Sequence, residues 1–245
     1  SIDELRVKIK NTLLFLLIYR IGTFIILPGI DGGVLMGALK NQTEGILGLV
    51  NIFAGGAFGR GAIFALGIMP YISASIVIQL LTIAVPTFQR MQKEGEDGRR
   101  KINQYTRFLT IAITMVQAVA YLYNITGKSD NWGALLFKTH PELMTESLFM
   151  IINVSLLVAG TMFTMWLGEK ITDKGLGNGI SLIIMIGIID RLPEALGFEL
   201  DQRISKGGLP LFIVEIVSWL GVIVATILLI QGVRKISVNY AKRIE

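Results

Sequence analysis

Long apolar blocks are the feature that most constrains how this chain of 245 residues can fold. A helix needs roughly 20 residues, at about 1.5 Å of rise each, to cross a hydrocarbon core about 30 Å thick. Six blocks come near this length: 11–30, 62–85, 108–125, 148–167, 180–192 and 209–230. The fifth is short, so we expect it either to recruit Leu176 and the neighbouring glycines or not to span alone.

Composition agrees with a membrane location. Hydrophobic residues make up 52% of the chain and charged residues 17%, and the mean hydropathy is +0.62. Soluble domains are less apolar and more highly charged. We therefore predict an all-α, polytopic membrane helix bundle. The first block is too long for the apolar core of a signal peptide, so we expect it to remain as a helix.

The distribution of basic residues predicts the orientation. Most of the 23 Lys and Arg residues fall in loops on the same side as the N-terminus. The positive-inside rule then places the N-terminus in the cytoplasm and, after six crossings, the end of the chain there too. The net charge of +5 is explained by this topology, so it does not by itself indicate nucleic-acid binding.

The sequence does not predict an enzyme, a metal site or a cofactor. His140 is the only histidine, it lies in a loop, and the chain has no cysteine. The serines within apolar blocks lack the G-x-S-x-G setting of an activated nucleophile. The glycine-rich stretches match neither G-x-G-x-x-G nor G-K-[ST], so energy for any transport would have to come from another protein.

Residues 45–85 are almost continuously apolar, yet they cannot form one straight helix. At about 1.5 Å per residue such a helix would be about 60 Å long, twice the hydrocarbon thickness. Glycine is unfavourable in helices, so Gly55, Gly56, Gly59 and Gly61 predict the break. We expect a half-helix over 46–58 and a long span that starts near Ala62. Irregular backbone at membrane depth must line a cavity or be covered by protein.

An alternative is that Gly55 and Gly59 form a G-x-x-x-G packing face in an ordinary helix pair. Arg60 argues against it, because an arginine in a lipid-facing seam is unfavourable. Further on, Ile68 and Ile72 are spaced i, i+4 around Pro70, which predicts a bent helix with both side chains on one side. Taken alone, two such isoleucines face lipid or the core.

Four long strings give the chain a specific likeness. "FALGIMPYISASIVIQLL", "EGEDGRRKINQYTR", "TMWLGEKITDKGLGNGISLII" and "VNYAKR" resemble, in the same order, the bacterial SecY family of protein-conducting channels. The likeness implies a ten-span fold of two inverted halves, of which this chain holds about six spans. Residues 1–208 would form the first half, with five spans, and residues 209–245 the sixth span and the start of a cytoplasmic loop.

The resemblance also implies site residues. The broken second helix would supply a plug over 45–60, with Asn51, Phe53, Gly55, Gly56 and Arg60. The remaining implied sites are a pore ring of Ile68, Ile72 and Ile184, a lateral gate of Ser73, Gln79 and Gln117, and a cytoplasmic partner surface of Arg99, Arg100, Lys101, Arg234, Lys235, Lys242 and Arg243. An apolar ring excludes ions when empty and can part around a threading polypeptide.

The family's partners follow from the same resemblance. They are the SecE and SecG subunits, the SecA motor or the ribosome with its rRNA, signal sequences, unfolded polypeptides and membrane lipids. The implied location is the bacterial cytoplasmic membrane, and the implied role is passive conduction of polypeptides.

Without the resemblance, half of a secondary transporter with a broken-helix solute site is the alternative. It would need acidic groups at the midplane, where we noted only Glu215. Arg20, in the middle of the first block, needs a partner that the sequence does not identify.

Overall fold

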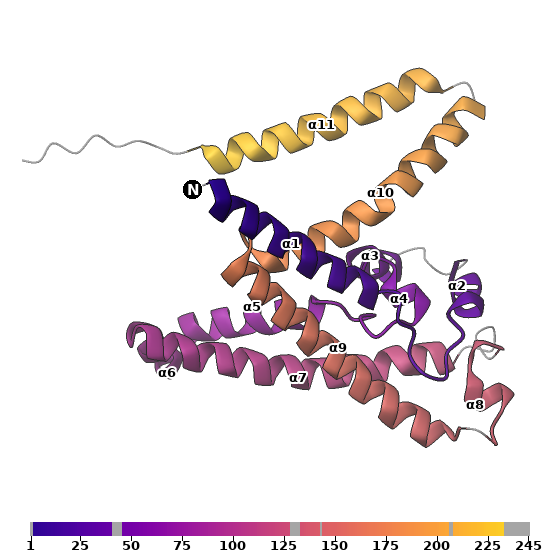
Figure 1. Ribbon diagram of the computed structural model, residues 1–245, viewed down its shortest axis with the longest axis horizontal. Coiled ribbons are helices and arrows are strands. Elements are labelled where there is room, and N and C mark those ends of the chain that lie inside the picture. The colour runs from indigo at the N-terminus through magenta and orange to yellow at the C-terminus, as the bar shows by residue number, and fades with distance from the viewer. Residues whose placement is uncertain (1, 41–45, 128–132, 143, 206–207, 233–245) are drawn as a thin grey trace, which may run out of the picture. The chain divides into compact units, whose positions relative to one another are not determined.

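The computed structural model describes residues 2–40, 46–127, 133–142, 144–205 and 208–232, and these are nearly all helical (Figure 1). The chain divides into two compact units, Ser1–Arg191 and Leu192–Glu245. The predicted division at residue 208 concerns the two repeat halves of a membrane fold. A division into compact units does not test it, so it stays a prediction. The all-α class is confirmed.

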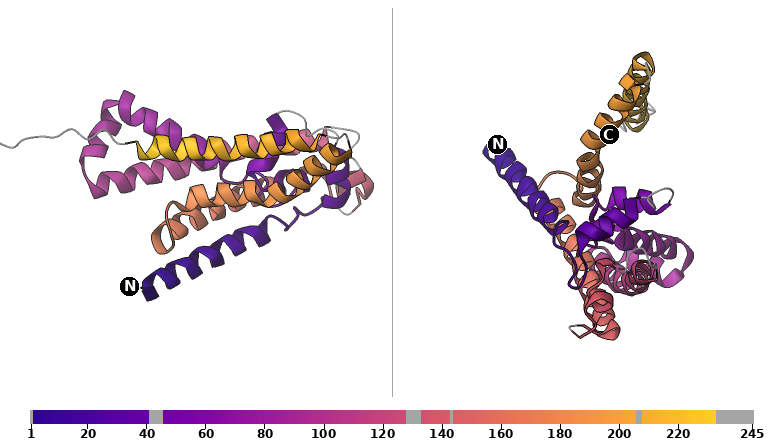
Figure 2. Two further views of the ribbon diagram at one scale, coloured as in Figure 1. Left: turned by 90° about the horizontal axis from the view of Figure 1, so that it is seen from above. Right: turned by 90° about the vertical axis from the view of Figure 1, so that its right-hand side faces the viewer.

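Long helices and short interrupted ones alternate in the first unit. Its elements are α1 (Ile2–Gly22), α2 (Gly32–Lys40), α3 (Ile46–Phe53), α4 (Ala57–Arg60), α5 (Met69–Ala84), α6 (Pro86–Lys93), α7 (Glu96–Thr126), α8 (Leu136–Thr139), α9 (Glu146–Lys174) and the first part of α10 (Gly179–Ser205). Figure 2 shows the extended stretch that carries the chain from α1 to α2.

Among the described residues, three helices are long and apolar enough to cross a membrane: Glu96–Thr126, Glu146–Lys174 and Pro210–Gln231. A fourth is gained if the bent pair α5 and α6 counts as one span. These correspond to the third, fourth, sixth and second predicted blocks. The helices α1 and α10 carry more charge, so the first and fifth spans stay predictions.

Several predicted boundaries were wrong. The first block was expected to be helical to residue 30, but α1 ends at Gly22. The fifth block, 180–192, was expected either to be lengthened at its start by Leu176 and the neighbouring glycines or not to span alone. Instead α10 starts at Gly179 and is lengthened at its C-terminal end, to Ser205. Part of the predicted cytoplasmic loop is helical, because α7 begins at Glu96 and runs without interruption into the third apolar block.

Pro70 starts a helix and does not bend one. It occupies the first turn of α5, where its missing N–H is not needed, so the expected span from Ala62 begins only at Met69. The bend comes later, at Pro86, since Val85 is held extended by the following proline and ends α5. The axes of α5 and α6 differ there by 97°.

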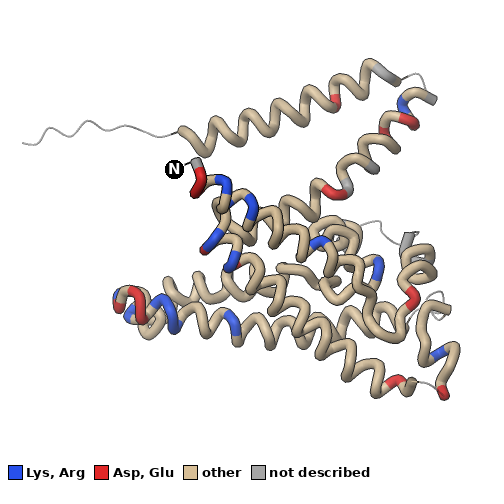
Figure 3. Tube along the Cα trace, viewed as in Figure 1, with Lys and Arg blue, Asp and Glu red and all other residues tan. Residues whose placement is uncertain are grey.

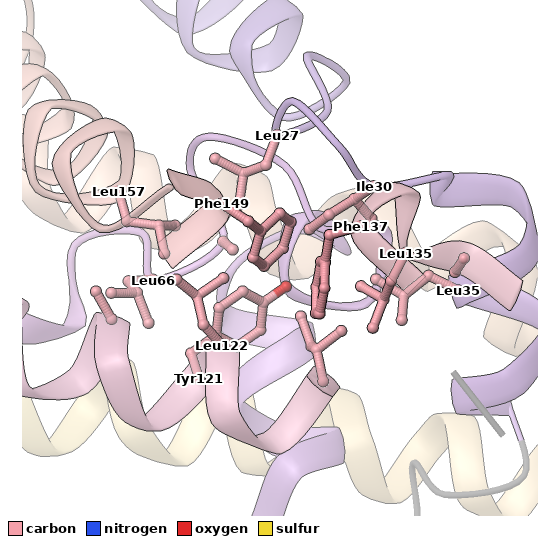
Figure 4. Packing of buried hydrophobic residues seen from close by; sticks show 14 residues of the cluster. Leu27, Ile30, Leu35, Leu66, Tyr121, Leu122, Leu135, Phe137, Phe149 and Leu157 are labelled. Atoms are coloured by element: carbon pink, nitrogen blue, oxygen red, sulfur yellow. The ribbon is translucent and has the colours of Figure 1, made fainter. Parts of the chain in front are cut away.

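The buried side chains of the first unit form two clusters. One joins the end of α7, α8 and the start of α9, and is centred on Phe137 and Phe149, whose ring centroids are 4.8 Å apart (Figure 4). The other joins α1, α9 and α10 and contains Tyr19, Leu167 and Ile183. Residues 54–66 contribute to both clusters, so the irregular stretch between the short helices and α5 is covered by protein on two sides.

The second unit consists of the rest of α10 and α11 (Leu209–Gln231). Arg203 joins them, with contacts of 2.7 Å to Glu199 and 2.5 Å to Glu215. The apolar residues of α11 are largely exposed, as expected for a span that faces lipid or further helices.

Candidate functional site

The stretch Ile46–Arg60, here called the interrupted segment, breaks as predicted but at a different place. Gly55 and Gly56 have φ of +59° and +79°, so α3 ends at Phe53 and the expected half-helix over 46–58 is wrong. Ala57 then starts the short helix α4, and Gly59 lies inside it. The left-handed backbone at Gly55 also rules out one continuous helix with a G-x-x-x-G face.

Asn51 closes this turn. Its side chain is buried, with 4% exposure, and its Oδ1 accepts a hydrogen bond of 2.9 Å from the Gly59 backbone N–H. Its own carbonyl accepts one of 2.8 Å from the Gly56 N–H. One residue therefore holds α3 and α4 together across the glycine pair, which explains a polar side chain in "ILGLVNIF".

Helix α7 holds the interrupted segment on one side. The Tyr121 hydroxyl donates a hydrogen bond of 2.7 Å to the Phe58 carbonyl, and the centroids of the two rings are 4.7 Å apart. Tyr121 is buried, so this bond is shielded from water.

The helices α1 and α10 hold the other side. Arg20 pairs with Asp190 of α10 at 2.5 Å, and its Nη1 donates to the Gly55 carbonyl at 3.3 Å. At Gly187 an added Cβ would lie only 2.9 Å from the Phe53 carbonyl oxygen, so α10 and the segment meet backbone to backbone. Asp190 thus answers the question that Arg20 raised. We overlooked Asp190 as a candidate partner, although it is the one acidic residue of the fifth block.

Phe53 and Arg60, the other two predicted plug residues of the segment, differ in their surroundings. Phe53 is 37% exposed. The Arg60 guanidinium lies over the ring of Phe24, 4.4 Å from its centroid, and Arg20 approaches the same ring at 4.6 Å.

The three predicted ring isoleucines differ in position and burial. Ile68 is the N-cap of α5 and is 3% exposed. Its carbonyl accepts a hydrogen bond of 3.1 Å from the Ile72 N–H, so the two residues lie one turn apart at the start of the helix. Ile72 and Ile184 are partly buried. Their role in a ring stays a prediction.

Two of the three predicted gate residues lie together. Ser73 of α5 and Gln117 of α7 line one cavity of about 350 Å³, with Phe58 and Tyr121 on its wall. Gln79 is exposed elsewhere on α5 and donates to Ser75 at 3.3 Å. The cavity therefore connects the interrupted segment with the α5–α7 seam.

The predicted cytoplasmic surface is only partly described. Charged residues gather at the turn from α6 to α7, whereas the middles of α5, α7 and α9 are uncharged (Figure 3). Arg99 and Arg100 are exposed there, and Lys101 pairs with Glu94 at 3.1 Å. Arg234, Lys235, Lys242 and Arg243 lie outside the described residues.

His140 lies in the loop after α8, as expected, and contacts Glu142 at 3.1 Å. The backbone amide of Glu142, followed by the His140 side chain, lowers the pKa of this exposed carboxyl group. Both groups face solvent, so the pair has no part in the site around the interrupted segment.

Comparison with known proteins identifies relatives over almost the whole chain. The SecY family model matches residues 62–245. The protein translocase subunit SecY of Escherichia coli (strain K12) is 44% identical over 242 residues, which cover 96% of this chain and 53% of the relative. That of Buchnera aphidicola subsp. Schizaphis graminum is 42% identical over 243 residues, covering 98% of this chain and 54% of the relative. The chain spans about half the length of these relatives.

Solved structures agree on the fold. A protein-conducting channel and the Sec61 of the canine ribosome-channel complex from the endoplasmic reticulum each match with a TM-score of 0.54. Each is 19% identical and covers 83% of this chain and 42% of its own. At this identity the match supports the fold alone.

Proposed function

Since this chain belongs to the SecY family, we propose that it forms part of a membrane channel that passes unfolded secretory polypeptides and releases apolar segments sideways into lipid. The interrupted segment would act as the plug of the resting channel. The observation that carries the proposal is a short, non-spanning helix pair held among α1, α7 and α10 by a few polar contacts at its glycine turn and at Phe58.

The properties of this segment suit a removable stopper. Its α3 has only eight residues, too few to span, and is followed by the left-handed turn at Gly55 and Gly56. The hydrogen bonds of Asn51 are internal to the segment, so it can move as one body. A pore ring of Ile68, Ile72 and Ile184 would then seal the remaining path by excluding water.

The gate would lie along the cavity at the α5–α7 seam. Ser73, Gln117 and Asn124 bring polar groups to a mostly apolar wall. A hydrogen bond between such groups on neighbouring helices contributes only about 0.6–2 kcal/mol in lipid. A signal sequence with its own apolar surface can compete for a seam held this weakly. Gln79 belongs to the proposal only by resemblance.

The partners belong to the proposal as well. They are SecE, SecG, and the SecA motor or a ribosome, which would bind the basic surface near Arg99 and Arg100. One structural neighbour is itself part of a ribosome-channel complex, which supports the ribosome as a partner. The location would be the bacterial cytoplasmic membrane with the N-terminus inside, as the charges at the α6–α7 turn favour. No catalytic step is proposed.

The transporter alternative is not favoured by the family match. A transporter would need acidic groups that are available to a solute, but Glu215 is paired with Arg203 and Asp190 is paired with Arg20. A carboxylate neutralised by an arginine is poorly suited to bind a transported cation.

Replacing Ile68 and Ile72 with serine in the complete channel tests the proposal. We expect ion conductance of the resting membrane to rise, because hydroxyl groups would let water enter the constriction. Ile83→Ser is the matched control, since Ile83 is on the same helix and 74% exposed. A resting membrane as tight as that of the parent channel would show that these isoleucines form no seal.

A further inference from the structure

Arg20 is placed to control the position of the interrupted segment. Arg20 lies in the last turn of α1, and its side chain contacts two other parts of the chain. Its Nη2 lies 2.5 Å from Oδ1 of Asp190 on α10, and its Nη1 donates a hydrogen bond of 3.3 Å to the Gly55 carbonyl. Arg20 therefore connects α1, α10 and the glycine turn of the segment.

The guanidinium group suits this arrangement. It offers several N–H donors in one plane, so it can bind a carboxylate and a carbonyl at the same time. The pair is only partly exposed, at 29% for Arg20 and 25% for Asp190, and an unpaired charge at membrane depth would be unfavourable. The Asp190 carboxylate thus holds the Arg20 guanidinium in position, and the guanidinium in turn bonds the Gly55 carbonyl of the glycine turn.

The glycine turn itself meets α10 through backbone alone, beside the buried cluster in which Ala54 and Ala57 of the segment pack with Ile183. Gly55 and Gly187 meet closely, with an added Cβ on Gly55 only 3.3 Å from the Gly187 Cα. Neither residue has a side chain, so no side chains interlock at this point. The turn can therefore separate from Gly187 without a rotamer change once the bond from Arg20 breaks.

We propose that Arg20 and Asp190 form a latch that holds the glycine turn of the interrupted segment in its resting place. Both are positioning residues, and the inference rests on the proposed role of this segment as a plug. Loss of either residue frees the turn and shifts the segment toward its displaced position.

The test measures the position of the segment directly. The chain has no cysteine, so Phe53→Cys introduces a single thiol at a position that is 37% exposed in the resting state. In the complete channel, the modification rate of this thiol by a membrane-impermeant maleimide is compared in Arg20→Gln, Asp190→Asn and Arg20→Lys backgrounds. Resting ion conductance and the abundance of the assembled channel are measured in the same membranes.

We expect Arg20→Gln and Asp190→Asn each to raise the modification rate about tenfold, which corresponds to about 1.4 kcal/mol. Arg20→Lys should give a smaller rise, because an ammonium group keeps the charge but loses the planar set of donors. The control is Arg107→Gln, which removes an ion pair of 2.7 Å between α7 and α9. It should leave the rate unchanged.

Rates in Arg20→Gln and Asp190→Asn equal to that of the parent would overturn the latch. So would an equal rise in Arg107→Gln, which would indicate general loosening. Faster modification with unchanged conductance would support the latch and contradict the plug role, so the two proposals fail separately.

Discussion

Replacing Gly187 with alanine adds one methyl group where α10 lies closest to the interrupted segment. The new Cβ would lie 2.9 Å from the Phe53 carbonyl oxygen and 3.3 Å from the Gly55 nitrogen. Both are backbone atoms, so a rotamer change cannot relieve the contact. The segment or α10 must move.

The magnitude follows from two opposing effects. Alanine is favoured over glycine inside a helix by about 1 kcal/mol. Inserting a methyl group into a close-packed contact costs about 1–3 kcal/mol. Gly197→Ala in the same helix is the matched control, because an added Cβ there meets nothing within 4 Å and only the favourable effect applies. The two variants should therefore differ by about 1–3 kcal/mol in favour of Gly197→Ala.

The assay is resting ion conductance of the complete channel in planar bilayers, with thermal unfolding in detergent beside it. We expect Gly187→Ala to raise conductance and lower the unfolding temperature, and Gly197→Ala to leave conductance unchanged. Equal behaviour of the two variants would refute the close contact between α10 and the segment.

Three further results are expected. Tyr121→Phe removes the hydroxyl group that bonds the Phe58 carbonyl and leaves that carbonyl only the 3.4 Å bond from the Gly61 N–H, so this attachment should weaken by about 1 kcal/mol and amide hydrogen exchange in α4 should become faster; unchanged exchange would contradict it. Gln117→Leu makes the cavity at the α5–α7 seam more apolar, so a larger share of marginally hydrophobic test segments should enter lipid, and an unaltered share would remove Gln117 from the gate. Arg99→Gln with Arg100→Gln should weaken binding of the cytosolic partner and flatten its dependence on salt; an unchanged salt titration would place the contact elsewhere.

Block length and glycine content predicted the helical class and the break after α3, because both depend on local sequence. The helix boundaries around α5 depended on two prolines, of which we had assigned a bend to Pro70 and had made no prediction for Pro86. Pro70 suits the first turn of α5, and the bend instead falls at Pro86. The pairing of Arg20 with Asp190 joins residues 170 positions apart, so it required the packing of α1 against α10. The basic residues beyond Gln231 remain expectations from resemblance.

The central claim is that the interrupted segment fills the resting channel and leaves it when a polypeptide passes. Spin labels on cysteines at Phe53 and Ile188 test it most directly, since both side chains are more than one-third exposed and the chain has no other thiol. We predict strong dipolar broadening in the resting channel and its loss when an arrested polypeptide occupies the pore. Broadening that persists unchanged in the occupied channel would contradict the claim.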